Sequence, residues 1–578
     1  MTRALARRLP AALVFLAAAV ATAGLWIVSR GKWSHPIVDS GREWIVPDSL
    51  ARGEMLYQDI VYWFGPLTPY LHAFVFEIFG SSFRTLVAAG VAASAAILVL
   101  LYMALRTVTG RTEAALGVLL AIPLLLFMPS AGGSILGMGY RIWHAAAFTL
   151  AAVALAVTPS RSWARAAGIG GLCAAAGLCR LEWGLAAIGG VAVCVAVREG
   201  FRLSCLREIL SAAVAFLLLC GGVLGAFVAV AGSDAVIGDG HVFLTGLPEE
   251  TRRFLLNNSG FHDPRGGTLR LLYSAILWAG IFLVVEVAAA WGEDRGRLRR
   301  RLPWIAGIAL YLFLYDEYGG SARLRLMSGA PLFGPVAVVA ALRRPGKPGS
   351  GALAGFGALA FVLSYRKLFS IGDSAYVAPP LLFALVSGAG LLALLVASQH
   401  EAAARRRLRR GVRVVLACLI LASFADRIAL YASDGRAILP GTEGMLSARP
   451  ETVRTLSLIS ENVRRRTAPH ESLVVFPEGE VLNYLSKRRN PLRNRLYIPG
   501  YVTKDNEAAV LRELESFRPG ALVILNRATA EYGRNFFGVD YARGIASWIR
   551  DNYIEVRFDP AAEKVPVESG ARLFLRKR

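Results

Sequence analysis

The sequence is poor in charged residues and in cysteine, and each shortage narrows the class of protein. Only 18% of its 578 residues are Asp, Glu, Lys or Arg, whereas soluble domains carry about 25%. A row of soluble domains is therefore excluded. The six cysteines all lie in apolar stretches or at their edges, no Cys-x-x-Cys occurs, and residues 432–578 contain none. Neither a zinc site nor a disulfide framework is indicated.

Long apolar runs are what the chain has in abundance. Hydrophobic residues make up 55% of it and the mean hydropathy is +0.48, which predicts a polytopic α-helical membrane protein. Runs long enough to cross ~30 Å of hydrocarbon predict thirteen transmembrane helices. They cover 10–29, 84–105, 114–129, 142–158, 165–179, 181–197, 208–231, 269–291, 303–318, 325–342, 351–365, 376–397 and 413–431. The pair within 165–197 also fits a re-entrant hairpin, which would leave every other orientation unchanged.

Basic residues cluster in every second loop between these runs, most densely at Arg405–Arg413. The positive-inside rule places those loops and the N-terminus in the cytoplasm. Most of the net charge of +23 lies there, so its expected partner is anionic membrane lipid and not nucleic acid. The triplet Ala21-Thr22-Ala23 also fits a signal-peptide cleavage site, but the apolar run continues through Val28, which favours an uncleaved helix.

Thirteen crossings from an inside start place residues 432–578 outside the cell, and this stretch is polar with charges of both signs. Short apolar runs at 472–476 and 521–525 predict buried strands. Periodic segments at 451–466, 506–517 and 540–551 predict helices. We therefore expect an extracytoplasmic α/β domain following a transmembrane domain of residues 1–431. The domain carries no clear enzyme motif.

The ionisable residues that lie outside the basic inner loops gather at the outer ends of the predicted helices. Such residues are costly near a membrane and usually functional. A transporter would need them near the midplane, so their position on one face predicts an outward-facing reaction cavity. They are Asp39, Arg42, Glu43, Arg141, His144, Arg180, Glu182, Asp316, Glu317, Arg323, Arg325, Tyr365, Arg366, Lys367 and Asp373.

The first outer loop, residues 30–83, is the most informative of these places. Asp39 and Glu43 are four residues apart, so on a helical turn both carboxylates share a face, with Arg42 between them. A carboxylate beside a hydrophobic pocket can act as a general base for an acceptor hydroxyl. Residues 69–79 predict a short interfacial helix with an aromatic rim. The alternative is a solvated loop whose charges only cap helices.

Residues 53–67 of this loop fit the pattern Gly-x-x-Leu-Tyr-x-Asp-x-x-x-x-x-Gly-Pro-Leu, and Phe79-Gly80 closes the element. With an early acidic residue, about a dozen spans and an outer C-terminal domain, this pattern resembles the GT-C superfamily. These are polytopic glycosyltransferases that take sugar from a polyprenyl phosphate at the outer membrane face. The bacterial branch related to protein mannosyltransferases and to aminoarabinose and galacturonic acid transferases is the most similar. Residues 477–491 resemble the outer domain of that branch.

The resemblance implies that Asp39 is the general base of an inverting sugar transfer. Many members have Asp-Glu at this point, whereas here Ser40 follows Asp39 and the second carboxylate is Glu43. The donor is expected to be a polyprenyl-phosphate-linked sugar. The acceptor is expected to be an envelope glycan, lipid or protein, and the location the bacterial cytoplasmic membrane.

The other polar residues at the outer helix ends are expected to bind the donor or to line the cavity around Asp39. The donor phosphate is expected to bind Arg180, Arg366, Arg323 and Arg325, with a structural ion pair or an interfacial anchor as the alternative for each. Further cavity residues are Arg42, Tyr57, Asp59, Glu182, Asp316 and Lys367. No metal ligand set is indicated, although the many carboxylates leave a divalent cation open as a cofactor.

Two rival functions follow from the same features. A transporter or lipid flippase predicts paired polar positions at mid-membrane in both halves, which the sequence lacks. A lipid-linked oligosaccharide polymerase or ligase predicts a large outer loop late in the chain, whereas the largest outer insertion here is about 232–268. The glycosyltransferase is therefore the favoured interpretation.

Overall fold

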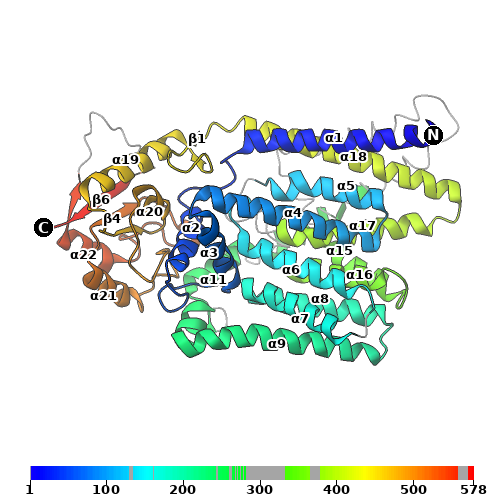
Figure 1. Cartoon of the computed structure of the whole chain (residues 1–578), viewed down its shortest axis with the longest axis horizontal. Helices are drawn as coiled ribbons and strands as arrows, with labels where there is room; N and C mark the ends of the chain where they lie inside the picture. The colour runs from blue at the N-terminus through cyan, green and yellow to red at the C-terminus, as the bar shows by residue number, and fades with distance from the viewer. Residues whose placement is uncertain are drawn as a thin grey trace.

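The computed structural model describes residues 2–128, 134–159, 162–241, 332–364, 378–556 and 570–577, together with most of 245–280. Long apolar helices run side by side in one part of the molecule (Figure 1). The other part, residues 433–577, is built around a four-stranded sheet and is called the C-terminal region below. The short helices α2 (Ser40–Ala51) and α3 (Leu67–Phe79) lie between the two parts.

Five of the described helices are long and apolar enough to cross a membrane, and shorter apolar helices pack beside them. The chain is thus a multi-pass membrane protein. The helices coincide with predicted runs; they are α1 (Thr2–Ser29), α4 (Phe83–Val108), α5 (Arg111–Ala121), α6 (Tyr140–Ala156), α7 (Trp163–Cys179), α8 (Leu181–Arg198), α9 (Ser204–Ala231), α15 (Phe333–Leu342), α16 (Ser350–Ser364), α17 (Ala378–Ser398) and α18 (Ala402–Ala432). The runs 269–291 and 303–318 lie largely or wholly outside the described residues, so the total of thirteen crossings stays a prediction.

The stretch 165–197 forms two helices, α7 and α8, of 17 and 18 residues. Each is close to the length that the hydrocarbon core requires, which favours two crossings over a re-entrant hairpin. Glycines let these helices approach closely: an added Cβ at Gly184 would lie 2.5 Å from the Cα of Gly177, and one at Gly170 would lie 2.2 Å from the carbonyl oxygen of Ala212 in α9. Small residues at such interfaces are typical of membrane helix packing.

Helices α1 and α18 run side by side along the apolar part and end together beside the C-terminal region (Figure 1). The Lys32 ammonium, after α1, donates hydrogen bonds to the carbonyl oxygens of Tyr431 and Asp434 at 2.7 and 3.0 Å. In the opposite direction, the Arg436 guanidinium donates a hydrogen bond to the carbonyl oxygen of Ser34 at 3.3 Å. The start of the first outer loop and the start of the C-terminal region are therefore fixed to each other.

The C-terminal region contains a sheet in the order β3-β4-β6-β5, in which β3 and β4 are parallel and the other pairs antiparallel. The predicted strands correspond to β3 (Leu473–Phe476) and β4 (Ala521–Leu525), whose side chains are almost all buried. The predicted helices correspond to α19 (Pro450–Arg466), α21 (Glu507–Phe517) and α22 (Arg543–Asn552). Elements beyond the prediction are β1 (Ala437–Ile438), β2 (Ser447–Ala448), α20 (Val481–Ser486), β5 (Tyr553–Val556) and β6 (Ala571–Arg576).

Helix α3 occupies the stretch expected to lie in the membrane interface. It buries Ala73 and Phe76 and leaves a row of large apolar side chains exposed. A helix with this division of surfaces suits the boundary between lipid and water. The exposed side chains are Leu71, Phe74, Ile78 and Phe79.

Candidate functional site

Asp39 immediately precedes α2 and is not part of the helix. Its φ of 65° is left-handed, and its carboxylate pairs with Arg42 one turn into the helix. An aspartate in this conformation costs of order 1–3 kcal/mol and persists only where surrounding contacts hold it. The Asp39 side chain is 16% exposed. The base candidate is therefore a strained residue at a helix start, with an arginine beside it.

Glu43 lies in the first turn of α2 and is more deeply buried, at 6% exposure. Its partner is Arg141 at the start of α6, with Nη2 and Oε1 2.8 Å apart. Burial raises the pKa of Glu43, and the Arg141 guanidinium opposes that rise. Asp39 is the residue before α2, and its carbonyl oxygen accepts the N–H of Glu43, so the two residues are one helical turn apart. Each carboxylate has its own arginine partner, and the expected shared face of the two stays a prediction.

The C-terminal region contacts this helix start directly. The backbone N–H of Asp39 donates a hydrogen bond to Oε1 of Glu478 at 3.0 Å. The other carboxylate oxygen of Glu478 lies 3.0 Å from Nε of Arg527. Gly41 makes the close approach possible, because a Cβ there would lie 2.3 Å from the backbone nitrogen of Val481.

Aromatic side chains and guanidinium groups gather next to Arg42. The Arg141 guanidinium lies 4.0 Å from the centre of the Phe64 ring, and that of Arg180 lies 5.3 Å from the same ring. Trp63 stacks on Tyr501 of the C-terminal region with ring centres 3.5 Å apart. A cavity of about 10 Å³ lies next to Arg42 and these rings, which is enough space for about one water. It is lined by Arg42, Val46, Val61, Tyr62, Trp63, Phe64, Arg495, Leu496 and Tyr501.

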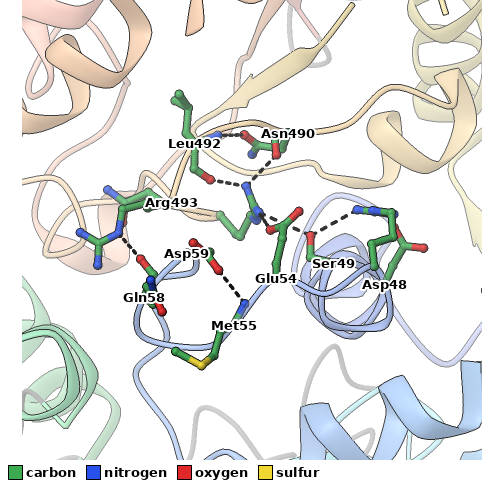
Figure 2. Close-up of polar contacts among 12 residues, drawn as sticks. Asp48, Ser49, Glu54, Met55, Gln58, Asp59, Asn490, Leu492 and Arg493 are labelled. Carbon is green, nitrogen blue, oxygen red and sulfur yellow. Dashed lines mark hydrogen bonds and ion pairs between the residues drawn. The ribbon is translucent and has the colours of Figure 1, made fainter. Parts of the chain in front are cut away.

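Two arginines of the C-terminal region hold the middle of the first outer loop (Figure 2). Arg493 donates to the carbonyl oxygens of Tyr57 and Gln58 at 2.9 and 2.8 Å. Arg495 pairs with Glu54 at 2.6 Å and is itself only 3% exposed. The loop is thus attached to the C-terminal region at several points along its length.

Tyr57 and Asp59 have structural contacts within this turn. Tyr57 is fully buried, has a φ of 68°, and donates its hydroxyl to the Phe64 carbonyl at 2.6 Å. Asp59 accepts the backbone N–H of Met55 at 2.8 Å (Figure 2). Neither lines the cavity beside Arg42, and their expected place in a substrate cavity stays a prediction.

Of the arginines expected to bind phosphate, Arg180 is the described one. It is the residue between α7 and α8, and it pairs with Glu182 at 2.5 Å. Arg180 and Arg141 contact the same Phe64 ring, so the structure brings Arg180 near the Glu43–Arg141 pair. The candidates Arg323, Arg325, Arg366, Asp316 and Lys367 lie outside the described residues.

Sequence reasoning missed the contribution of the C-terminal region to the site. Glu478 comes two residues after β3, and Arg527 comes two residues after β4. Because β3 and β4 are parallel, residues just beyond their carboxyl ends meet at one edge of the sheet. That rule applied to the two predicted strands would have paired Glu478 with Arg527, although it would not have placed them beside Asp39.

The charged groups of the site are arranged as carboxylate–arginine pairs. Asp39, Glu43 and Glu478 each have an arginine partner. Within the described residues, no group of three or more His, Cys, Asp or Glu could hold a metal ion. The arrangement supplies carboxylates able to accept a proton and guanidinium groups able to bind an anion such as phosphate.

Comparisons with known proteins identify the fold. No family model matches the chain, and no curated protein matches it. Among solved structures it is similar to the oligosaccharyltransferase of Archaeoglobus fulgidus in complex with Zn and sulfate, at 15% identity over 89% of this chain and 68% of that one, with a TM-score of 0.50.

Two further solved structures match over most of this chain. The archaeal oligosaccharyltransferase AglB from Archaeoglobus fulgidus, in complex with an inhibitory peptide and a dolichol-phosphate, is 13% identical over 96% of this chain and 75% of that one, with a TM-score of 0.49. ArnT from Cupriavidus metallidurans bound to undecaprenyl phosphate is 14% identical over 97% of this chain and 98% of that one, with a TM-score of 0.48. The likeness to the oligosaccharyltransferase shows that this chain shares the fold of that membrane protein.

Proposed function

We propose that this protein is a glycosyltransferase that moves a sugar from a polyprenyl-phosphate donor to a cell-envelope acceptor. The reaction takes place at the outer face of the bacterial cytoplasmic membrane, and the acceptor is a glycan, lipid or protein. The observation that carries the proposal is the Asp39–Arg42 pair at the start of α2, the helix that lies between the apolar helices and the C-terminal region (Figure 1). The GT-C fold and the lipid phosphates bound by solved proteins of similar fold support the same reaction.

The proposed orientation follows from charge. The basic cluster Arg405–Arg413 at the start of α18 lies in the cytoplasm together with the N-terminus. The opposite ends of α1 and α18, which join the first outer loop to the C-terminal region, then lie outside. Exposed apolar side chains on α3 rest in the outer interface. The lipid chain of the donor lies among the helices, with its phosphate at their outer ends.

The proposed reaction is a single displacement at the anomeric carbon of the donor sugar. The acceptor hydroxyl oxygen forms a bond to that carbon while the bond from the carbon to the phosphate oxygen breaks. The electron pair of the broken bond stays on the leaving phosphate, and the hydroxyl proton passes to the carboxylate of Asp39. One displacement inverts the anomeric carbon.

Guanidinium groups stabilise the charge that grows on the phosphate. Arg141 and Arg180 lie against the Phe64 ring, and Arg42 and Phe64 both line the small cavity beside it. An arginine can hold phosphate through two parallel hydrogen bonds, which fixes its direction as well as its charge.

Asp39 is a better base than Glu43 on two counts. Its side chain is more exposed, at 16% against 6%, so an acceptor hydroxyl can reach it. Glu43 is closed in by Arg141, which lies against the rings of Tyr62 and Phe64. The role of Glu43 is therefore to hold Arg141, and that of Asp39 is to take the proton.

The test has two stages. Mass spectrometry of envelope glycans from a strain lacking this protein, against the complemented strain, identifies the transferred sugar. Purified variants are then assayed with undecaprenyl phosphate carrying that sugar. Asp39→Asn keeps the shape of the side chain but cannot accept the proton, and should lower the rate by about 10²–10⁴-fold.

The control variant is Asp505→Asn, which makes the same change at an exposed aspartate of the C-terminal region and should be silent. Glu43→Gln should cost less than Asp39→Asn. Full activity of Asp39→Asn together with a dead Glu43→Gln would move the base to Glu43. Identical glycans with and without the protein would remove the glycosyltransferase proposal and favour a transporter.

A further inference from the structure

We propose that Glu478 of the C-terminal region is a positioning residue for Asp39, fixing the backbone of the base while Arg527 fixes Glu478. The inference rests on the proposed function of Asp39. It assigns the C-terminal region a direct part in the reaction, beyond shaping access for the acceptor.

The backbone of Asp39 is held on both sides. Its N–H donates to Glu478 at 3.0 Å, and its carbonyl oxygen accepts the N–H of Glu43 at 2.9 Å, which is the first hydrogen bond of α2. The positive φ of Asp39 is uncommon for a residue other than glycine, and surrounding contacts help to maintain it. The bond to Glu478 is the one that comes from outside the loop's own helix.

Glu478 is suited to holding a position and not to exchanging protons with a substrate. It is 2% exposed, and its two carboxylate oxygens contact different groups, Oε1 the Asp39 amide and Oε2 the guanidinium of Arg527. Arg527 is in turn braced by Glu531 at 3.0 Å. A buried carboxylate with both oxygens engaged in this way has a single orientation.

The surroundings of Glu478 make that orientation depend on Arg527. Burial and the neighbouring Asp39 carboxylate raise the pKa of Glu478, while Arg527 and Arg42 lower it. Removal of the Arg527 contact would leave a buried carboxylate beside a second carboxylate. Charge and geometry therefore agree that Asp39, Glu478 and Arg527 form one chain of contacts from the loop to the sheet.

Several contacts other than Glu478 also join the first outer loop to the C-terminal region. Arg493 and Arg495 hold the loop through its carbonyl oxygens and Glu54 (Figure 2), and Trp63 stacks on Tyr501. The loop is thereby docked independently of Glu478. Replacement of Glu478 should consequently shift Asp39 without detaching the loop.

The first experiment measures kcat and KM of Glu478→Gln with the undecaprenyl-phosphate sugar identified above. The amide oxygen can still accept the Asp39 N–H, but the amide group cannot pair with Arg527, so the orientation is lost. Because a displacement of about 1 Å can cost 10²-fold in rate, kcat should fall roughly 10- to 100-fold. KM for the donor should change less than threefold, since Glu478 does not touch it.

Glu471→Gln is the matched control. Glu471 also accepts a backbone N–H, from Ala468 at 2.7 Å, and also pairs with an arginine, Arg576 at 3.2 Å. It lies at the other end of the parallel strand β3, before Leu473. The same chemical change there should leave kcat within twofold of the wild type.

A second experiment separates positioning from a general loss of folded protein. In Asp39→Asn the base is already absent, so adding Glu478→Gln should lower the residual rate no further. A merely structural Glu478 would reduce the rate by the same factor in both backgrounds. That result, or a wild-type kcat for Glu478→Gln, would overturn the positioning role. Full activity of Asp39→Asn would instead overturn the assignment of Asp39 as the base, whereas identical envelope glycans with and without the protein would overturn the proposed function.

Discussion

Replacement of Gly41 by alanine tests how closely the site depends on the junction between the loop and the C-terminal region. The new Cβ would lie 2.3 Å from the backbone nitrogen of Val481 and 2.6 Å from the carbonyl carbon of Glu480. Both are backbone atoms and cannot rotate away. Ordinary contact begins near 3.4 Å, so α2 and the segment after β3 must separate by about 1 Å.

The two effects of this separation differ in size. Overpacking costs about 1–3 kcal/mol, of which about 1 kcal/mol is regained because alanine is a better helix former than glycine. The net loss of stability is therefore small. The same 1 Å shift acts on the Asp39–Glu478 hydrogen bond two residues away, where it should lower the transfer rate by roughly 10²-fold.

The assay compares initial transfer rates and thermal unfolding of purified Gly41→Ala with those of Gly24→Ala. Gly24 is also inside a helix, α1, but a Cβ there would meet nothing within 4 Å. The control should keep wild-type activity. A fully active Gly41→Ala with an unchanged unfolding temperature would refute the claim that this junction sets the position of Asp39.

Three further predictions concern charge, pH and topology. Arg180→Lys keeps the positive charge but cannot form two parallel hydrogen bonds to phosphate, so it should raise KM for the donor. Arg180→Ala should raise KM further. Wild-type kinetics in both variants would show that Arg180 is only a structural partner of Glu182. Burial raises the pKa of Glu480 to about 8 from an ordinary 4.5. Its contribution to stability is thus lost as pH rises from about 4.5 to 8, and Glu480→Gln should flatten the pH dependence of unfolding. Cysteine placed at exposed Arg465 should react with an impermeant thiol reagent in intact cells, and cysteine at exposed Lys347 should not; the reverse would overturn the orientation.

The sequence predicted the helices well because their signal is local. A run such as 208–231 is uniformly apolar, and its bounds in α9 differ by a few residues at one end only. The strands β3 and β4 were equally readable as short buried runs. The strands β5 and β6 were not, because Tyr553–Val556 is short and exposes its two middle residues, and Ala571–Arg576 carries an arginine near each end.

The contacts of the site were predictable from the sequence only where they join residues close together in the chain. The contact between Asp39 and Arg42 spans three residues, so spacing alone brought them together. The contacts of Glu43 with Arg141 and of Asp39 with Glu478 join distant parts of the chain, and nothing in the local pattern distinguishes these partners from other charged residues. Spacing also placed Asp39 and Glu43 one helical turn apart, although it could not show that each carboxylate contacts a different arginine.

The distance in sequence between Asp39 and Glu478 also orders events during biosynthesis. The two residues are 439 positions apart, and chains grow at about 5–20 residues per second, so roughly 20 to 90 seconds separate their synthesis. Throughout that interval the first outer loop is already made, while the sheet edge that holds Asp39 does not yet exist. A growing chain therefore carries its base without its support, and the proposed transfer activity begins only when nearly the whole protein has been translated.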